Sequence, residues 1–203
     1  MQKFILAPML MTVGLASPVF AQDADELTVY GGPIIGYDHI RYKGAVVRGK
    51  EDGIAYGGLL GVQVPIAENV VSGLEGEITD TDIKTTTSPV FLTNDTLSAT
   101  AKRDLYVGGR MGYHVAPSTL IYIKGGYSNL RIKADYSDGI TPVSAADNLD
   151  GYRIGGGIEV RFGALRVLAE YRYSDYSSFK YQGISTGIDA KRQQAMLSVL
   201  MGF

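Results

Sequence analysis

The amino-acid sequence predicts an all-β fold, an eight-stranded antiparallel up-and-down transmembrane β-barrel preceded by a cleavable signal peptide. Segments near the roughly 9 to 11 residues of a tilted membrane strand alternate between apolar and polar side chains. Short and long connections between these segments also alternate along the chain. An export signal stands at the start of the sequence and points to the cell envelope. We therefore expect a signal peptide over residues 1–21 and an outer-membrane β-barrel domain over residues 22–203.

The first residues have the three parts of a secretory signal peptide. Lys3 gives a positive start, an apolar run covers residues 4–15, and small residues precede a cleavage site at Ala21. The apolar run is shorter than the roughly 20 residues that a membrane-spanning helix needs. Because the chain contains no Cys, a lipid-anchored cysteine and a disulfide framework are both excluded.

Composition after the signal narrows the possible function classes. The formal net charge of the whole sequence is -2, so no basic surface of the kind that nucleic acid requires is expected, and nucleic acid is not a predicted partner. No later apolar stretch approaches the roughly 18 residues that indicate a membrane helix. If the chain enters a membrane it must do so as a closed barrel, because only helices and barrels satisfy every backbone polar group in lipid.

Eight strands are predicted after the signal, with three tight turns and four long polar loops between them. The predicted strands are residues 27–38, 54–64, 70–82, 102–115, 119–134, 151–162, 165–177 and 191–203. The tight turns are residues 65–69, 116–118 and 163–164, and the long loops are residues 39–53, 83–101, 135–150 and 178–190. Strict alternation of short and long connections is typical of an up-and-down barrel with short periplasmic turns and long outer loops. A β-sandwich would instead require Greek-key crossings.

Each predicted strand has one apolar and one charged face. In the last strand, Leu197, Val199 and Phe203 fall on one side, because successive side chains point to opposite faces. In the strand over residues 151–162, Ile158 belongs to the apolar face and Glu159 to the opposite, charged face. A water-soluble barrel of the lipocalin type would turn the apolar face inward to bind an apolar ligand, and periodicity alone does not separate these two arrangements.

Two patterns favour the membrane arrangement. Aromatic residues of the apolar face lie near strand ends, as in the interfacial girdles of membrane barrels. Those toward the long loops are Tyr37, Tyr127, Tyr152, Tyr171 and Tyr173, and those toward the short turns are Tyr113, Phe162 and Phe203. The charged face carries both signs in near balance, which suits a narrow lumen closed by paired charges. The predicted lumen network consists of Glu75, Glu77, Arg110, Lys124, Glu159, Arg161, Arg166, Glu170 and Arg172.

Glycine recurs inside the strands, often beside tyrosine. A strand tolerates glycine where a neighbouring ring covers the gap or where the sheet must curve strongly, and closing eight strands requires strong curvature. A phosphate-binding loop would need a strand followed by a helix, and no helical periodicity follows any glycine run. Pro33 would remove a donor from the middle of the first strand, and we expect a β-bulge there.

The last third of the chain resembles a known family. The segments GYRIGGGIEV at residues 151–160 and LRVLAEYRYSDY at residues 165–176 are similar to the signature hairpin of porin-family outer-membrane β-barrel proteins. These are the opacity-type, OmpA-barrel-like proteins of Gram-negative bacteria. The resemblance implies an eight-stranded barrel in the outer membrane, surrounded by outer-membrane lipid and lipopolysaccharide. It also implies that the insertion machinery of that membrane reads the C-terminal strand ending in Phe203.

The sequence offers little for catalysis or for cofactor and metal binding. The two histidines, His39 and His114, are predicted at opposite ends of the barrel, and no Ser forms a convincing pair with His39. Asp80, Asp82 and Asp95 carry the oxygen ligands that a hard cation prefers, but strand capping and solvation explain them more simply. We expect no enzymatic activity, no cofactor and no metal site.

The expected role is structural or one of surface interaction. The lumen is predicted to be plugged by the charged network, because eight strands enclose a space just wide enough for side chains. The long outer loops are the candidate binding surface for a ligand that the sequence does not identify, since loops on a rigid scaffold commonly carry binding. The alternative is a small, weakly conducting porin-like channel.

Overall fold

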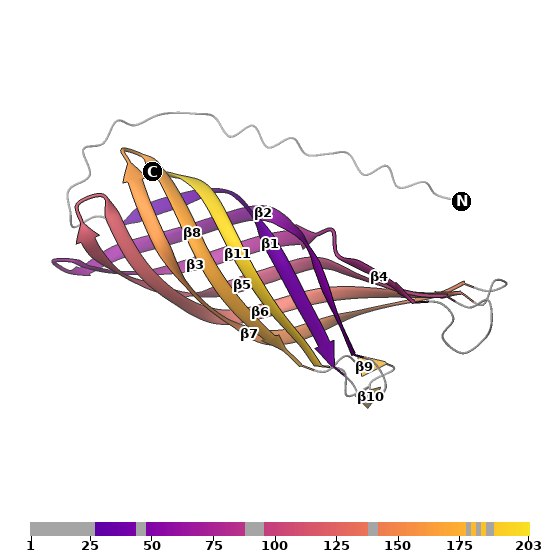
Figure 1. Cartoon of the computed structure of the whole chain (residues 1–203). Helices are drawn as coiled ribbons and strands as arrows, with labels where there is room; N and C mark the ends of the chain where they lie inside the picture. Colours follow the sequence, from indigo (N-terminus) through magenta and orange to yellow (C-terminus); the bar gives the residue numbers. More distant parts are fainter. Residues whose placement is uncertain are drawn as a thin grey trace, which may run out of the picture.

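The structure, a computed structural model, describes residues 27–43, 48–87, 96–137, 142–177, 180–181, 184–185 and 189–203 (Figure 1). The signal peptide predicted over residues 1–21 and the loop residue Asp95 lie outside these ranges. Within the described part of the chain, no helix is long and apolar enough to cross a membrane. The strands are β1 (Thr28–Lys43), β2 (Arg48–Ala67), β3 (Val70–Thr81), β4 (Lys84–Thr87), β5 (Thr96–Ala116), β6 (Thr119–Ser137), β7 (Pro142–Phe162), β8 (Leu165–Tyr176), β9 (Lys180–Tyr181), β10 (Ile184–Ser185) and β11 (Asp189–Gly202).

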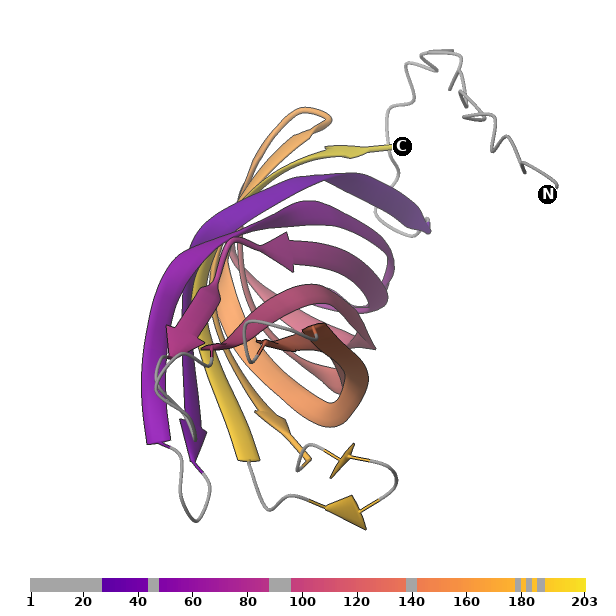
Figure 2. The same cartoon turned by 90° about the vertical axis from the view of Figure 1, so that its right-hand side faces the viewer.

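The long strands form a closed antiparallel barrel, which confirms the predicted fold class. Neighbours in the sheet follow the order β3-β2-β1-β11-β8-β7-β6-β5-β4, and a further pairing of β3 with β5 closes the ring. Because β4 pairs with β5 beyond the end of β3, β4 continues the line of β3. Figure 2 shows the strands curving around one common axis. The small β9–β10 hairpin forms a separate sheet.

The two ends of the barrel differ, as predicted, in the length of their connections. At the end called here the short-turn end, β2–β3, β5–β6 and β7–β8 are joined by the two-residue turns 68–69, 117–118 and 163–164. Gly163 has a φ of 64°, a conformation that favours glycine and that a type II′ hairpin turn requires at its first central position. The opposite end, called the long-hairpin end, carries longer extensions of the strands.

The prediction of long irregular loops over residues 39–53 and 135–150 is wrong. β1 continues to Lys43 and pairs with β2 from Arg48, while β6 continues to Ser137 and pairs with β7 from Pro142. Parts of residues 83–101 and 178–190 are also strand, in β4, β5, β9, β10 and β11. Backbone pairing continues into these regions although the apolar stripe has ended. Outside a bilayer both faces of a hairpin can be polar, so the alternation of apolar and polar residues that indicates a strand in a sequence is lost there.

The β-bulge predicted at Pro33 is also wrong. Pro33 stands opposite Gly58 of β2 in an unbroken register. On its other side, the pairing of β1 with β11 passes from Gly31–Met201 to Ile34–Ser198 without a shift. The ladder therefore loses bonds locally at Pro33, where the ring has no N–H to donate, but no extra residue is inserted.

The apolar stripes face outward. Ile123 is 68% exposed and Leu74 is 64% exposed on the outside of the barrel. Val199 is also exposed, whereas Arg153 and Glu159 on the inner face are 0% exposed. The alternative of a soluble barrel with an apolar interior for ligand binding is therefore wrong for the described residues.

Candidate functional site in the barrel lumen

The inner face of the barrel carries a set of charged side chains that is neutral overall. Among the described residues, six carboxylates and six cations on strands β1, β3, β5, β6, β7, β8 and β11 are buried. They are Asp38, Glu75, Glu77, Asp104, Glu159 and Glu170 with Arg110, Lys124, Arg153, Arg166, Arg172 and Arg192. Burial of a charge is tolerated when it is paired and hydrogen-bonded, and these side chains are paired with one another in a continuous network.

At the short-turn end, Glu159 collects three arginines. Its carboxylate lies 2.6 Å from Nη2 of Arg110, 3.2 Å from Nη1 of Arg166 and 3.0 Å from Nε of Arg161. The Arg161 side chain is 26% exposed and marks the mouth of the lumen. Arg110 also contacts Glu75 at 3.1 Å, which links this cluster to the middle of the barrel.

In the middle of the lumen, the ammonium group of Lys124 lies among three glutamates. Nζ is 3.1 Å from Glu75 and 2.9 Å from Glu170, and it also donates to Glu77. Single carboxylate oxygens of these glutamates lie within 4.8 Å of one another, a spacing that could also hold a metal ion. Because the Lys124 ammonium contacts all three carboxylates, it supplies the positive charge of this cluster.

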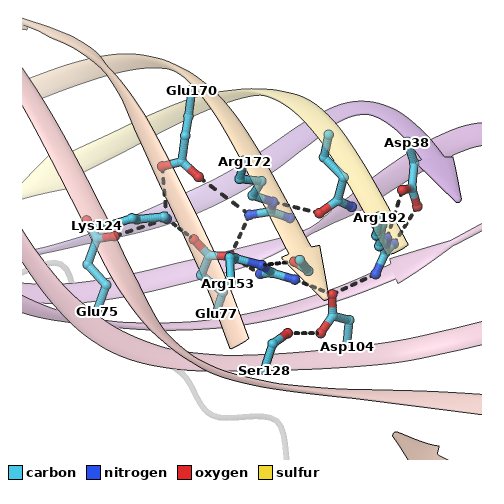
Figure 3. Close-up of polar contacts among 12 residues, drawn as sticks. Asp38, Glu75, Glu77, Asp104, Lys124, Ser128, Arg153, Glu170, Arg172 and Arg192 are labelled. Carbon is cyan, nitrogen blue, oxygen red and sulfur yellow. Dashed lines mark hydrogen bonds and ion pairs between the residues drawn. The ribbon is translucent and has the colours of Figure 1, made fainter. Parts of the chain in front are cut away.

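Toward the long-hairpin end, the network continues through alternating charges (Figure 3). Glu77 accepts hydrogen bonds from Arg172 at 2.5 Å and from Arg153 at 3.1 Å. Arg153 also donates to Asp104, and Asp104 lies 2.6 Å from Arg192. The Arg192 guanidinium then makes a two-pronged contact with Asp38, in which Nε donates at 2.8 Å. Paired contacts of this kind are the strongest ion pairs available to arginine.

Neutral side chains add hydrogen bonds to the network. The Tyr30 hydroxyl donates to Glu75 at 2.8 Å, and the Tyr122 hydroxyl donates to Glu170 at 2.9 Å. The Tyr122 ring also stacks on the Arg110 guanidinium, 3.7 Å from its centroid. The Tyr30 ring lies over Gly61, where a Cβ atom would come within 2.5 Å of the ring. Glycine at this position leaves the space in which the tyrosine reaches the network, as ring covering of strand glycine predicts.

Apolar clusters lie inside the barrel with the charges. Leu130, Leu149, Tyr176 and Ala190 form one cluster, and Ile40, Ile83 and Ala101 form another. These two belong to the long-hairpin side, since their members follow Asp38 in β1 and precede Asp104 in β5. A third cluster contains Tyr30, Leu59, Tyr122, Leu168 and Leu200. The interior is thus filled by side chains of both kinds.

The structure places the nine predicted network residues on the inner face, eight of them buried and Arg161 at the mouth. Sequence reasoning left out Asp38, Asp104, Arg153 and Arg192. The sequence does indicate Arg153, because it lies an even number of residues from Glu159 in the same predicted strand and so shares its face. Arg192 and Asp38 lie 154 residues apart in sequence, so their pairing depends on the register of β1 against β11.

The eight predicted interface aromatics all lie on the outer face. Seven are exposed, namely Tyr37, Tyr113, Tyr127, Tyr152, Phe162, Tyr171 and Phe203, and Tyr173 is partly exposed. Three of these tyrosines donate to outward-facing aspartates: Tyr37 to Asp52, Tyr127 to Asp150 and Tyr173 to Asp175. Each aspartate lies nearer the long-hairpin end than its tyrosine, so polar groups begin where the apolar stripe ends.

The histidines lie apart, as expected. His39 Nδ1 is 2.6 Å from Asp52, but its other nitrogen accepts a hydrogen bond from Arg41 Nε at 3.0 Å. A nucleophile would need that second nitrogen as its base, and the position is taken by Arg41. His114 lies near the short-turn end, where its ring contacts Arg161 at 3.4 Å. Neither arrangement gives positive support for catalysis.

The carboxylates considered for a cation bind backbone groups. Asp82 accepts a hydrogen bond from the Ile54 amide at 2.7 Å, and Asp80 accepts one from the Thr81 amide at 2.8 Å. These contacts cap the point at which β3 gives way to β4, as the strand-capping interpretation predicts.

Comparison with known proteins agrees with this architecture. A family model described as "Outer membrane protein beta-barrel domain" matches residues 7–196, whereas no curated protein matches the sequence. Among solved structures, Neisserial surface protein A is similar with a TM-score of 0.51 and 10% identity over 86% of this chain and 97% of that one. Ail of Yersinia pestis gives a TM-score of 0.49 and 14% identity over 85% and 99% of the two chains. The N-terminal barrel of Pseudomonas aeruginosa OprF gives 0.43 and 14% over 85% and 99%. By the family match and its closed eight-stranded barrel, the chain belongs to the outer membrane protein beta-barrel family of Gram-negative bacteria, and its location is the outer membrane.

Proposed function

We propose that the protein is a structural or surface-interaction protein of the outer membrane with a closed lumen. The observation that carries this proposal is the continuous charge network, which runs from Arg166 through Glu159, Lys124 and Glu77 to Asp38. Salt bridges cross the lumen between strands distant in sequence, so they fill the cross-section rather than line its wall. An eight-stranded barrel has no further width for a water-filled path once such side chains occupy it.

The paired hairpins at the long-hairpin end are the proposed binding surface. The extension of β6 and β7 beyond Asn129 is polar on its outer face, with Arg131 and Lys133 exposed. A rigid scaffold that carries exposed hairpins is a common arrangement for recognition.

The C-terminal strand is the proposed contact with the insertion machinery. Phe203 is exposed on the outer face, and its backbone amide donates to Val29 at 2.7 Å. Deleting Phe203 should slow insertion in cells and leave refolding into detergent micelles nearly unchanged. Equal loss in both assays would show that Phe203 acts only through barrel stability.

Planar-bilayer conductance tests the closed lumen. The wild-type protein should give no discrete current steps, and Lys133→Ala, on the outside of the barrel, should match it. Steps in the wild type that become larger in Arg110→Ala or Glu170→Ala would overturn the proposal and establish a small channel. The same samples must show the heat-modifiable electrophoretic mobility of a folded barrel.

The orientation of the barrel can be tested with single cysteines, because the natural chain has none. Lys133→Cys should react with a membrane-impermeant maleimide on intact cells. Ser118→Cys, in a short turn, should react only after the outer membrane is opened. The reverse pattern would contradict an outward long-hairpin end.

A further inference from the structure

A cavity of about 780 Å³ opens at the short-turn end of the barrel. Its lining includes Thr28 at the start of β1, Gln63 of β2, His114 of β5 and Arg161 of β7. Each of these four residues lies an even number of positions from an inward-facing residue of its strand, so all four belong to the inner face. The cavity is therefore the mouth of the lumen at this end.

The mouth carries more positive charge than the neighbouring carboxylate balances. Among the described ion pairs, Arg161 and Arg166 share a single carboxylate, that of Glu159. Because Glu159 also contacts Arg110, one carboxylate serves three guanidinium groups. Glu68 lines the cavity too, but it is exposed in the turn after β2 and forms no ion pair within the described part of the chain. The partly exposed Arg161 guanidinium can therefore take a further anionic partner.

A buried hydrogen-bond acceptor lies beside the start of β1. Gln63 is 5% exposed, and its Oε1 atom accepts no hydrogen bond from the residues that the structure describes. In the pairing of β1 with β2, Gln63 stands directly opposite Thr28. A buried acceptor without a donor is unfavourable. The mouth therefore suits a ligand that supplies an N–H donor for Gln63 together with a carboxylate for Arg161.

The residues that precede β1 in the sequence have this chemistry. Cleavage at Ala21, as the sequence predicts, leaves a mature chain that begins Gln-Asp-Ala-Asp-Glu at residues 22–26. This segment has three carboxylates, no Lys or Arg, and a backbone N–H at each residue. Glu26 stands two residues before Thr28, so a segment that continued the line of β1 would turn both side chains toward the lumen.

We propose that this acidic segment binds the mouth of the lumen as an intramolecular ligand. A carboxylate of Asp25 or Glu26 accepts from the Arg161 guanidinium, and a backbone N–H of the segment donates to Gln63. A sphere with the volume of the cavity is about 11 Å across, which four extended residues span at about 3.3 Å each. Because the segment is joined to β1 at the cavity itself, its effective concentration there is on the order of millimolar, which favours it over a free acidic peptide.

The test measures how fast a polyethylene glycol maleimide labels a cysteine at the mouth of the refolded mature chain, residues 22–203. Ala116 lines the cavity, so Ala116→Cys reports whether the cavity is occupied. Binding through one partly exposed ion pair should slow the labelling about fivefold. Changing Asp23, Asp25 and Glu26 to Asn, Asn and Gln should remove this protection. Salt at about 0.5 M should weaken it in the same direction, because it screens the exposed charges.

Two controls separate binding at the mouth from a general effect of the segment. Ser118→Cys is exposed in the turn that follows β5 but does not line the cavity, so its labelling rate should be the same with either segment. In an Arg161→Gln background, Ala116→Cys should be labelled equally fast with the acidic and the neutral segment, because the partner of the carboxylates is gone. All variants must keep heat-modifiable mobility, and the changes in the segment lie outside the barrel strands.

Three outcomes would overturn the inference. They are equal labelling of Ala116→Cys with the acidic and the neutral segment, a difference that persists undiminished in the Arg161→Gln background, and an equal slowing at Ser118→Cys, which would indicate that the segment covers the turns without entering the mouth. The inference rests on the predicted cleavage at Ala21. The intact mass of the protein isolated from cells tests that cleavage separately, so failure of the one is distinguishable from failure of the other.

Discussion

Removing one charge from the lumen should destabilise the barrel, and removing its partner as well should restore part of the loss. Glu77 is a fully buried carboxylate with three cationic partners, Lys124, Arg153 and Arg172. Glu77→Gln preserves the shape of the side chain but leaves the buried set with one excess positive charge. Arg172→Met leaves it with one excess negative charge. The double variant is neutral again.

The magnitude follows from the burial of the pair. The Glu77 and Arg172 side chains are both 0% exposed, and the two charged groups are 2.5 Å apart. Breaking a buried pair by removing one partner costs about 3 to 5 kcal/mol, because the remaining charge stays buried without compensation. Coupled residues depart from additivity by about 0.5 to 3 kcal/mol. We expect the double variant to be less destabilised than the sum of the single variants by about 2 kcal/mol.

Urea unfolding in lipid vesicles measures these free energies. The chain has no Trp, so tyrosine fluorescence reports unfolding, and the heat-modifiable band reports the folded fraction. Lys133→Gln is the control, because its pair with Asp135 is solvent-exposed and should contribute about 0 to 1 kcal/mol. Single variants within about 0.5 kcal/mol of the wild type, or a double variant equal to the sum within that margin, would refute the coupled network.

Two further predictions concern single positions. Gly61→Ala should destabilise the barrel by about 1 to 3 kcal/mol, because the new methyl group displaces the buried Tyr30 ring. Gly58→Ala is the control and should be close to neutral, because no atom lies nearer than 3.8 Å to the added Cβ. Equal effects of the two variants in unfolding assays would count against the packing of the Tyr30 ring over Gly61. The Tyr37 hydroxyl donates a hydrogen bond to Asp52 and lowers the pKa of that carboxyl. The stabilisation from this contact is therefore fully present above the ordinary pKa of about 3.9, and it is lost as pH falls through the lowered pKa. Carbonyl NMR titration should give an Asp52 midpoint below 3.9, and a higher midpoint would contradict the contact.

The barrel wall could be predicted from sequence because its two faces have different surroundings. In β7, Ile154 and Ile158 face lipid, whereas Arg153 and Glu159 face the lumen. Apolar and charged residues therefore alternate along the strand, and this alternation is visible in the sequence. Beyond Asp150 toward the long-hairpin end, water lies on the outer face and the constraint disappears. The strand pairing of residues 142–150 therefore had no signal in the sequence.

The sequence predicts which residues belong to the network but not which of them form ion pairs with each other. Because alternate residues of a strand share a face, the positions of Glu77 and Lys124 in their strands are enough to place both side chains inside the barrel. Their contact depends on the stagger between β3 and β6, which are separated in the sheet by β5. That stagger is fixed by the closure of the whole cylinder, a property of eight strands together that no local segment contains.

The charges of the lumen also explain why the barrel adopts one register. A slip of one residue in a strand exchanges its two faces. For β7 such a slip would bring Arg153 and Glu159 into contact with lipid. A charged side chain on the lipid face of a barrel costs up to about 2 to 4 kcal/mol at the bilayer midplane and less toward the interfaces. It would also leave Asp104 and Arg110 buried without these partners. An apolar lumen would impose no such penalty, because apolar side chains are equally suited to lipid and to the interior. The paired charges therefore make any register that exchanges the two faces of a strand unfavourable.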